Sequence, residues 1–413
     1  LGVDRLEIRR INAPGGGGAG TRFGARRQPV TSAYLREALE KGAARFGWEK
    51  RKAVGGTGTW PKLRGLGIGQ AFHVAGFSGF DGLVRIAPDG RLHVHTGVGN
   101  LGTYSYAATC RVAAEVLGYD WRRVVIERGG TARHLPWNLG QFSSNTSFTM
   151  ARTNYVAAMD AAAKLREVAA AVLGGAPGDF VLRGERVVAR DDPARALSFA
   201  EAARRAIALG GRHAGHDLPG DLNDMTRRAA QALAGTGLIG VARDGLEKDG
   251  AVPAFTAAFI EIELDVETGR FGILDYLAVA DCGTVLHPQG LAAQIRGGAV
   301  MGFGLATTER HVYDPAHGRP DARGLHRAKP LTVLDIPARM EWAAVNAPDG
   351  ASPMGSKGIG EPVQGAASSA LLCAISDALG GHVFNRVPVT TDMIVLAAAG
   401  YPPDTGPLAT NTV

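Results

Sequence analysis

Ala-Ala-Phe-Ile-Glu-Ile-Glu-Leu-Asp at residues 257–265 largely alternates apolar and polar side chains, and a turn at 267–270 separates it from a second apolar run at 271–280. Alternation with a period of two predicts a strand, and two runs joined by a Gly-containing turn predict an antiparallel pair. Residues 81–87 and 91–96, with Pro-Asp-Gly between them, show the same pattern. These two strand pairs predict a protein built on antiparallel sheets.

Helical patterns surround the strand pairs. The clearest is the Ala-rich stretch at 151–173, whose composition favours a long helix. Further helices are expected at 32–46, 105–117, 198–209, 291–305 and 364–379, and a further strand at 123–127. The sequence therefore predicts the α+β class, with two successive blocks of mainly antiparallel strands and with helices packed on one face of the sheets.

The length of 413 residues exceeds the size at which one hydrophobic core stops growing, so several units are expected. They are a helical connector at 1–62 that continues from a missing upstream part, a first α+β block at 63–250, a second block at 251–400 and an extended tail at 401–413. The amphipathic start without Met or a signal sequence would follow if the chain were processed, split or partial.

Hydrophobic residues make up 45% and charged residues 20% of the chain, which is ordinary for a globular protein. The formal net charge of +6 points to an anionic partner, but the basic residues are scattered. We therefore expect no nucleic-acid binding, and an anionic cofactor or an acidic partner chain fits better. No apolar run reaches about 18 residues, so no transmembrane segment is expected. The cytoplasm is favoured, and the periplasm stays open if a partner carries an export signal.

The cysteines and histidines predict no side-chain metal site. Cys110, Cys282 and Cys373 lie far apart in apolar surroundings, which favours burial in the core and leaves any iron–sulfur cluster to other chains. His93 and His95 alternate on one strand face, a spacing that can bind metal. Because no third ligand is evident, a solvated strand face is the favoured interpretation.

Glu361 lies in Gly-Ser-Lys-Gly-Ile-Gly-Glu-Pro at residues 355–362, directly before a predicted helix. Gly358 and Gly360 permit a tight turn, and Pro362 suits the first helical position. Taken alone, the commoner role of such a carboxylate is to cap the helix. A carboxylate presented there could instead accept a proton during catalysis.

Three further segments carry glycines or hydroxyl groups next to predicted elements. Thr-Gly-Val-Gly-Asn-Leu-Gly-Thr at 96–103 follows a strand and opens a helix, and Ser-Ser-Asn-Thr-Ser-Phe-Thr at 143–149 precedes the long helix. Hydroxyls and free N–H groups at a helix N-terminus form a site for anions and polar rings. The last segment is Asp-Cys-Gly-Thr-Val-Leu-His-Pro at 281–288, followed by Gln-Ile-Arg-Gly-Gly at 294–298 and Gly-Phe-Gly at 302–304.

Together the four segments, in their order along the chain, resemble the C-terminal part of the molybdopterin-binding large subunit of the xanthine dehydrogenase and aldehyde oxidase family. The resemblance covers nearly the whole chain, and its most specific element, 355–362, is similar to the family's Lys-x-x-Gly-Glu-Pro signature. It implies a molybdenum–pterin cofactor in a dinucleotide form, with no side chain of this chain bound to the metal. The residues that it implies in cofactor binding are Leu101, Gly102, Thr103, Thr146, Ser147, Phe148, Thr149, Gln294 and Gly360.

The resemblance also implies other roles. Glu361 matches the catalytic base, and Phe72 and His73 match positions that line the substrate channel, where an aromatic ring sandwiches a planar substrate. For Phe72 a place in the core is equally open, and His73 differs in type from its counterpart in the purine enzymes, which hints at a different substrate. Glu309 also matches a family position but is interpreted as structural, and Asp281 is expected to fix a turn.

The chain departs from the family pattern in three respects. The family usually has Gly-Gln-Gly where this chain has Gly102, Thr103 and Tyr104, so one amide contact to the cofactor is missing or replaced by a hydroxyl. Thr146 stands where the family usually has a smaller residue. The upstream parts of the subunit are absent, so a second polypeptide or a missing N-terminal half is expected to complete the molybdenum pocket.

The resemblance implies part of the large catalytic subunit of a molybdenum hydroxylase, active only with partner chains. The first block would carry the cofactor-binding loops and the second block Glu361. The reaction would be oxidative hydroxylation of an aldehyde or N-heterocycle with water as the oxygen source. Electrons would pass to an iron–sulfur subunit and then to a flavin (FAD) or cytochrome subunit. Carbon monoxide oxidation stays open, and so does a catalytically silent scaffold or binding chain derived from the same fold.

Overall fold

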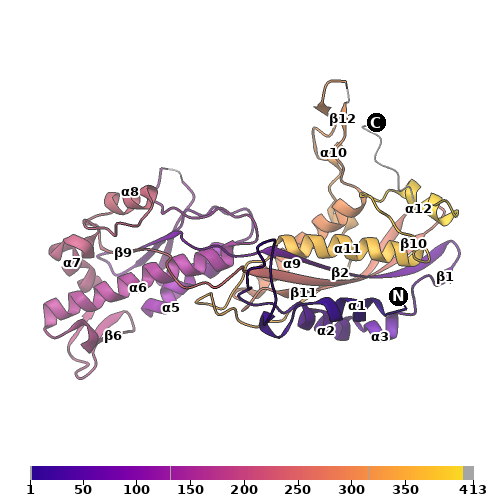
Figure 1. Ribbon diagram of the computed structural model, residues 1–413. Coiled ribbons are helices and arrows are strands. Elements are labelled where there is room, and N and C mark those ends of the chain that lie inside the picture. Colours follow the sequence, from indigo (N-terminus) through magenta and orange to yellow (C-terminus); the bar gives the residue numbers. More distant parts are fainter. Residues whose placement is uncertain (1, 131, 315, 403–413) are drawn as a thin grey trace. The chain divides into compact units, whose positions relative to one another are not determined.

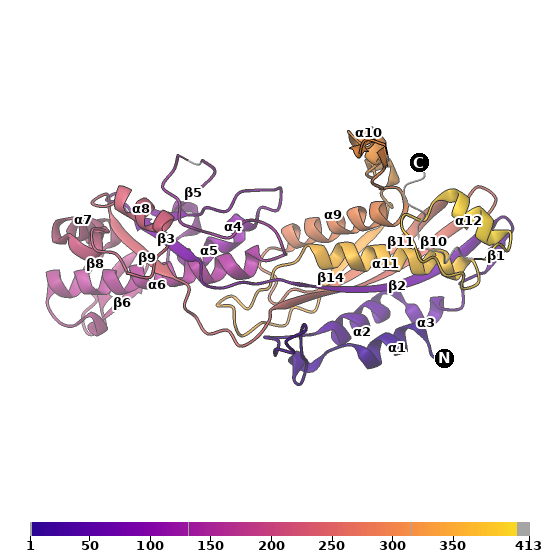
Figure 2. The same ribbon diagram turned by 45° about the horizontal axis from the view of Figure 1, so that its top comes forward.

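The chain folds as two units whose segments interleave along the sequence (Figures 1 and 2). The computed structural model describes residues 2–130, 132–314 and 316–402, so most of the tail expected at 401–413 lies outside the described residues. Of these residues, unit 1 contains those within 2–74, 253–347 and 359–402, and unit 2 contains those within 75–252 and 348–358. This division differs from the expected blocks at 63–250 and 251–400, because each unit is assembled from separate stretches of the chain.

Unit 1 is built on a five-stranded sheet in the order β1–β2–β10–β11–β14. The strands are β1 (Gly58–Thr59), β2 (Lys62–Val74), β10 (Pro253–Asp265), β11 (Phe271–Asp281) and β14 (Met340–Ala344). Neighbours are antiparallel except for β11 and β14, which run parallel. The strand pair expected at 257–265 and 271–280 is confirmed as β10 and β11. β2, which the expected first block included, pairs along its whole length with β10.

Helices cover both faces of this sheet, so the expectation of helices on one face is wrong for unit 1 (Figure 1). One face carries α9 (Pro288–Thr307), α11 (Glu361–Ala378) and α12 (Thr391–Ala398). The other carries α2 (Leu35–Phe46) and α3 (Trp48–Arg51), with α1 (Arg5–Asn12) packed on α2. The reason lies in β10, which is buried at every position from 253 to 262. A strand that is apolar on both faces requires cover on both.

The packing of α11 on β2 depends on glycines at alternate positions of the strand. A Cβ added at Gly65, Gly67 or Gly69 would overlap a backbone carbonyl oxygen of α11. The carbonyl groups that these three positions meet belong to Ala374, Ala370 and Ala366, respectively. The helix backbone therefore lies directly on the backbone of the strand.

Helix α9 holds α11 from a second side. A Cβ at Gly302 would overlap the carbonyl oxygen of Gln364, and one at Gly298 would lie 2.9 Å from the Cβ of Val363. Because protein interiors are close-packed and Gly302 meets a main-chain carbonyl that cannot rotate away, the backbone shapes fix the position of α11 between β2 and α9.

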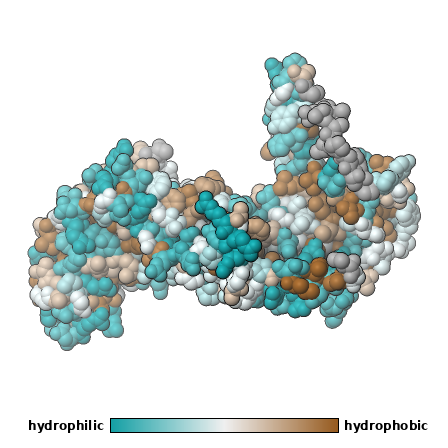
Figure 3. Space-filling model, viewed as in Figure 1, coloured by the Kyte–Doolittle hydropathy of each residue, from teal (hydrophilic) through white to brown (hydrophobic). Residues whose placement is uncertain are grey.

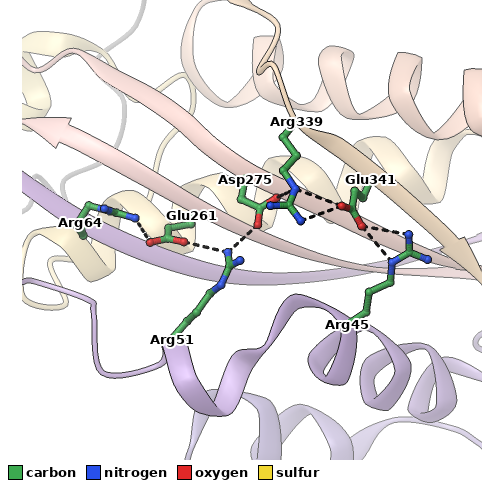
Figure 4. Close-up of polar contacts among 7 residues, drawn as sticks. All are labelled: Arg45, Arg51, Arg64, Glu261, Asp275, Arg339 and Glu341. Atoms are coloured by element: carbon green, nitrogen blue, oxygen red, sulfur yellow. Dashed lines mark hydrogen bonds and ion pairs between the residues drawn. The ribbon is translucent and has the colours of Figure 1, made fainter.

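Ion pairs connect the helices on the other face to the sheet (Figure 4). Glu261 and Asp275 lie opposite each other on β10 and β11, and both are buried. Arg51 of α3 bridges them, with its guanidinium 3.0 Å from Glu261 and 2.7 Å from Asp275. The series of pairs continues through Arg64 at one end and through Arg339, Glu341 and Arg45 at the other. Because two buried carboxylates side by side repel each other, they need the arginines that pair with them, of which Arg51 contacts both.

Unit 2 is built on a four-stranded sheet in the order β5–β4–β3–β9, with the long helix α6 (Thr146–Leu173) packed on it. The strands are β3 (Asp81–Ile86), β4 (Leu92–His95), β5 (Val124–Glu127) and β9 (Leu238–Arg243). β3 and β4 form the expected hairpin. The approach of α6 is as close as that of α11. A Cβ at Gly82 would overlap the Thr153 carbonyl oxygen, and one at Gly240 would lie 2.6 Å from the Cβ of Ala161.

The other elements of unit 2 surround α6 and its sheet. They are α4 (Ser105–Thr109), α5 (Arg111–Leu117), α7 (Phe199–Leu209), α8 (Asp224–Ala232) and a three-stranded sheet of β6 (Phe180–Arg183), β7 (Arg186–Ala189) and β8 (Ala196–Ser198). Unit 1 also contains β12 (Tyr313–Asp314), β13 (Arg319–Pro320) and α10 (Leu325–Ala328). Single 3-10 turns lie at Gly16–Gly18, Trp121–Arg123, Pro177–Asp179, Gly211–Ala214 and Val333–Asp335.

Several element boundaries differ from the sequence expectation, and two of the differences lie in helices of unit 2. The helix expected at 105–117 is divided at Cys110 into α4 and α5. Helix α6 begins at Thr146 rather than at 151, because the Asn145 carbonyl already accepts the first helical hydrogen bond, from the Thr149 N–H. In the part of the chain that the structure describes, no helix is both long and apolar enough to cross a membrane.

The cysteines lie in or beside the cores, as expected. Cys110 and Cys282 are buried, and Cys373 is half-buried with its sulfur 3.7 Å from the Arg9 guanidinium. Burial raises the pKa of the Cys110 thiol to about 12. This thiol therefore stays protonated and unreactive at neutral pH.

Replacing Gly67 by Ala should destabilise the protein, because the added Cβ would overlap the Ala370 carbonyl and neither backbone can move aside. We expect the free energy of unfolding to fall by about 3 kcal/mol, measured by chemical denaturation. Gly272→Ala is the matched control, since Gly272 lies in β11 of the same sheet and a Cβ there would meet nothing within 4 Å. Equal stability of the two variants would contradict the packing described for α11.

Candidate functional site

Glu361 is the first residue of α11, so the helix begins three residues earlier than the position 364 expected from the sequence. Gly360 is its N-cap, and the Val363 N–H donates to the Gly360 carbonyl at 3.1 Å. A Cβ at Gly298 would lie 3.3 Å from this same carbonyl oxygen. The first turn of α11, which presents the half-buried Glu361, is therefore held against α9.

Gln294 lies one helical turn before Gly298 on α9 and is half-buried. Residues four apart share a face of a helix, so Gln294 is on the side of α9 that approaches α11. Gly298 and Gly302 meet successive parts of α11, which means that the two helices run in the same direction. Gln294 therefore lies at the end of this helix pair where Glu361 begins α11.

The segment that leads to Glu361 is fixed within unit 2 as far as Gly358. A Cβ at Gly358 would overlap the carbonyl oxygen of Ser144, and the Gly358 N–H donates to the Ala75 carbonyl at 3.2 Å. The Ser356 hydroxyl donates to the Ser147 carbonyl at 3.1 Å. Gly358 of the 355–362 motif thus allows two backbones to approach closely, which only a residue without a side chain permits.

Arg152, which sequence reasoning missed, ties the same segment to α6. Its side chain is fully buried and pairs with the equally buried Asp244 at 2.8 Å. The guanidinium also donates to the carbonyls of Leu246, Glu247 and Ala351. One buried cation therefore joins α6, the loop after β9 and the segment 348–358. The signal in the sequence was an arginine within an Ala-rich helix, since buried charges are rare unless they are paired.

Gln141 holds the loop at 96–103 and was also missed. Its side-chain oxygen accepts from the Leu101 N–H at 2.7 Å, and its amide nitrogen donates to the hydroxyls of Thr103 at 2.8 Å and Ser105 at 2.7 Å. Asn100 supports the loop from within, because its side-chain oxygen accepts from the Gly102 N–H at 3.1 Å. The Thr103 hydroxyl, which replaces a glutamine of the family pattern, is thus bonded to the loop itself.

The outer surface of this loop is open backbone. A Cβ at Gly99 or Gly102 would meet nothing within 4 Å, and Gly102 has a φ of +90°. Leu101 between them is 76% exposed. A flat group could therefore lie against the loop without displacing a side chain.

The four expected residues at the start of α6 divide into two pairs. Thr146 and Ser147 are half-buried in the first turn, where helical N–H groups have no partner within the helix. Phe148 and Thr149 are fully buried: the Phe148 ring packs beneath Gly76, and the Thr149 hydroxyl accepts from the Phe77 N–H at 3.2 Å. The structure therefore gives the buried pair a packing role and leaves Thr146 and Ser147 available to a ligand.

Phe72 is not a core residue, because 57% of its side chain is exposed. Its ring packs edge-on against Phe23 with a centroid distance of 5.3 Å and lies 6.1 Å from Phe255. His73 is the next residue of β2, so the two side chains point to opposite faces of the strand. No pattern in the sequence pointed to Phe23, which lies far from Phe72 along the chain in a loop without predicted structure.

His93 and His95 do not lie on a solvated strand face, because Glu127 of β5 contacts His93 and the loop after β5 contacts His95. His95 is buried, and its Nδ1 lies 3.0 Å from the His134 carbonyl. The Nδ1 of the half-buried His93 lies 3.0 Å from Glu127. Among the described residues, no group of three or more His, Cys, Asp or Glu side chains could hold a metal ion.

Asp281 and Glu309, the two carboxylates interpreted as structural, both contact main-chain groups. Asp281 is fully buried and accepts from the Tyr34 N–H at 2.9 Å, which ties the N-terminal loop to the end of β11. Glu309 packs over Gly304 at the end of α9, where its N–H donates to the Gly304 carbonyl at 2.9 Å.

Comparison with known proteins extends these observations. The family described as the molybdopterin cofactor-binding domain matches residues 41–337. The xanthine dehydrogenase molybdenum-binding subunit of Escherichia coli O157:H7 is 26% identical over 395 residues, which cover 94% of this chain and 49% of that protein. The aldehyde oxidoreductase molybdenum-binding subunit of the same organism is 28% identical over 406 residues, which cover 95% of this chain and 48% of that protein.

Two solved structures share the fold. Carbon monoxide dehydrogenase from Oligotropha carboxidovorans superposes with a TM-score of 0.77 at 21% identity, over 96% of this chain and 49% of that chain. Quinoline 2-oxidoreductase from Pseudomonas putida 86 superposes with a TM-score of 0.75 at 24% identity, over 97% of this chain and 50% of that chain. These likenesses agree with the α+β class expected from the sequence. The chain spans about half the length of the relatives that it matches.

The burial of His95 predicts a pH dependence of stability. Burial lowers the pKa of His95 from 6.5 to about 4. Between these values the unfolded state binds more protons than the folded state, so stability is complete above pH 6.5 and falls as the pH drops towards 4. In His95→Gln, the fall in the free energy of unfolding across this window should be about 3 kcal/mol smaller, measured from urea midpoints. Parallel pH profiles for the two proteins would contradict the neutral, buried state of His95.

Removing the Gln141 side chain should free the loop at 96–103. We expect the Leu101 amide to exchange its hydrogen roughly tenfold faster in Gln141→Ala, because one hydrogen bond is lost directly and two that brace the loop are lost with it. Hydrogen exchange of the peptide containing 97–105 measures this. Gln231→Ala, at an exposed position on α8, is the control and should leave that exchange unchanged. Protection that persists without Gln141 would show that other contacts hold the loop.

Proposed function

Because this chain belongs to the molybdopterin cofactor-binding domain family, we propose that it forms the C-terminal part of the large catalytic subunit of a molybdenum hydroxylase. The reaction would be oxidative hydroxylation of an aldehyde or N-heterocycle, with water as the oxygen source. The names of its relatives support this class of reaction, since they include an aldehyde oxidoreductase subunit and the large subunit of a nicotine 6-hydroxylase.

Each unit, taken by itself, carries residues whose chemistry suits a molybdenum–pterin group. In unit 2, the open backbone at Gly99 and Gly102 can accept a flat ring, and the Thr146 and Ser147 hydroxyls lie at the positive end of a 28-residue helix, which favours an anionic pyrophosphate. In unit 1, the half-buried amide of Gln294 offers both a donor and an acceptor. Leu101 and Thr103 would contribute through their backbone, because the Thr103 hydroxyl already bonds to Gln141.

We assign to Glu361 the role of general base. When bound, the molybdenum–pterin group would supply the water-derived oxygen and accept two electrons from the substrate carbon. The carboxylate of Glu361 would take up a proton on one of its oxygens during this step and release it afterwards. Gly360, as N-cap, would place backbone rather than a side chain beside that carboxylate.

The observation that carries this proposal is the fixed first turn of α11. A general base must be held within hydrogen-bond reach of the proton that it removes, so its position matters more than its intrinsic basicity. Here α9 and β2 both contact α11 backbone to backbone, which leaves the helix little freedom to shift. A residue whose only task was to cap a helix would not require such support.

Partner chains are part of the proposal. The matched relatives are about twice as long as this chain, so a further polypeptide segment or chain would supply the upstream half of the subunit. An iron–sulfur subunit and a flavin or cytochrome subunit would receive the electrons. The internal bonding of Thr103 favours one alternative, a silent scaffold derived from this fold, and the metal content of the purified complex distinguishes the two.

Changing Glu361 to Gln keeps the shape of the side chain and removes its basicity. In the purified complex, turnover of an aldehyde or N-heterocycle should fall about 10²- to 10⁴-fold, while the molybdenum and pterin content stays at the wild-type level. Glu309→Gln is the matched control, since Glu309 packs against Gly304 at the far end of α9, and it should retain activity. Near-normal turnover of Glu361→Gln would refute the assignment, and a wild-type complex without molybdenum would favour the scaffold.

A further inference from the structure

A cavity of about 480 Å³ lies at the surface of unit 2, and charged side chains line most of it. Its lining residues are Asp89 and Arg91 from the turn between β3 and β4, Arg122 and Arg123 from the 3-10 turn before β5, and Val125 of β5. Ligand pockets in proteins commonly enclose roughly 300–1,000 Å³, so this cavity has the size of a small-molecule site.

The cavity lies at the starts of β4 and β5, which are parallel neighbours. The loop at 96–103 follows the opposite end of β4, four residues or about 13 Å further along the strand. Val124 and Ile126 pack into the core beneath α6, so Val125 between them points to the other face of the sheet. The cavity is therefore part neither of the core nor of the candidate cofactor-binding loop.

Arginines outnumber acids in the lining by three to one. Arg91 and Arg122 are exposed, and each meets a carboxylate only through its Nε, at 3.8 Å from Asp89 and 3.2 Å from Asp120, respectively. Within the described residues, neither side chain uses its terminal Nη groups in a hydrogen bond. Because a guanidinium has five N–H donors, both arginines retain donors for an anion from solution.

The walls of the cavity are held in place from behind. Glu185, in the turn between β6 and β7, pairs with Arg123 and accepts from the Asp120 N–H at 3.2 Å. The buried Tyr119 hydroxyl donates to the Gly90 carbonyl at 3.1 Å, which ties the other turn to the segment before β5. In the view of Figure 3, hydrophilic residues predominate on the part of unit 2 around β6. Donors that are fixed in advance lose less freedom when a ligand binds.

The chemistry of the lining suits phosphate groups. Arginine donates paired, charge-assisted hydrogen bonds to phosphate oxygens. Val125 is the single apolar residue of the lining, and no lining residue is aromatic, so the cavity offers no surface on which a ring could stack. Three guanidinium groups spread over two turns suit several linked phosphate groups better than one.

We infer that this cavity is a binding site for a chain of phosphate groups, either free polyphosphate or the polyphosphate part of a nucleotide. Arg91, Arg122 and Arg123 donate to the phosphate oxygens, and Asp89 limits the affinity because its negative charge faces the same cavity. The site does not depend on the proposed function.

Calorimetric titration of the purified complex with orthophosphate, tripolyphosphate and ATP tests this site. Wild type should bind tripolyphosphate roughly tenfold more tightly than orthophosphate, because more arginine donors are engaged. The affinity should fall as salt is raised, since the arginines are exposed. Tighter binding of ATP than of tripolyphosphate would identify a nucleotide as the source of the phosphate chain, and the reverse order would identify free polyphosphate.

Variants of the lining test the two signs of charge. Replacing Arg91 and Arg122 together by Gln should weaken tripolyphosphate binding roughly tenfold. Asp89→Asn should strengthen it about threefold, because a repulsive charge is removed while an oxygen remains to accept from the Arg91 N–H. This gain cannot arise from unfolding. The matched control replaces Arg190 and Arg212 by Gln, two exposed arginines of unit 2 outside the lining, and should bind as wild type does.

Two results would overturn the inference. Tripolyphosphate binding that is unchanged in the double variant would place the phosphate elsewhere in the complex. Equal affinities for orthophosphate and tripolyphosphate in wild type, with no gain in Asp89→Asn, would show an ordinary solvated surface. Because binding is measured without turnover, neither result depends on whether the complex contains molybdenum.

Discussion

The direct contact between the backbones of β2 and α11 is the constraint on which unit 1 depends. Gly65, Gly67 and Gly69 leave no room for a side chain beneath the helix, and small alanines face them at intervals of four residues. Such contact gains dispersion energy along the whole length of both elements, but only in one register. α9 adds a second glycine contact, so α11 cannot slide without losing both. As a consequence, the position of Glu361, the first residue of α11, is fixed as well.

Unit 2 repeats this arrangement with different strands. The Ala-rich helix α6 lies on Gly82 of β3 and Gly240 of β9, again with backbone against backbone. Its first turn carries Thr146 and Ser147, as the first turn of α11 carries Glu361. In each unit, therefore, glycines of the sheet strands fix the long helix whose N-terminus bears candidate site residues. Helix N-termini suit this use, because their free N–H groups and positive potential attract anionic groups.

Two polar side chains, the buried Arg152 and the half-buried Gln141, complete the support of the candidate site. Arg152 gathers carbonyl groups from two segments around one buried ion pair, and Gln141 holds three groups of a single loop. Leaving the ion pair of Arg152 unsatisfied in the interior would be unfavourable, which makes its contacts specific as well as stabilising. Arg152 and Gln141 can therefore influence where a ligand binds without touching the ligand themselves.

The sequence alone determined the strand pairs, the long helices and the motif at 355–362, because these depend on periodicity and on residues adjacent in the chain. It also carried the family resemblance, since motif order is a property of the sequence. Only the tertiary structure decided that the units interleave, that helices cover both faces of the sheet in unit 1, and that Phe23, Gln141 and Arg152 support candidate site residues. The physical reason is that such contacts join residues far apart in the chain, and nothing in the local pattern specifies which distant partner each will meet.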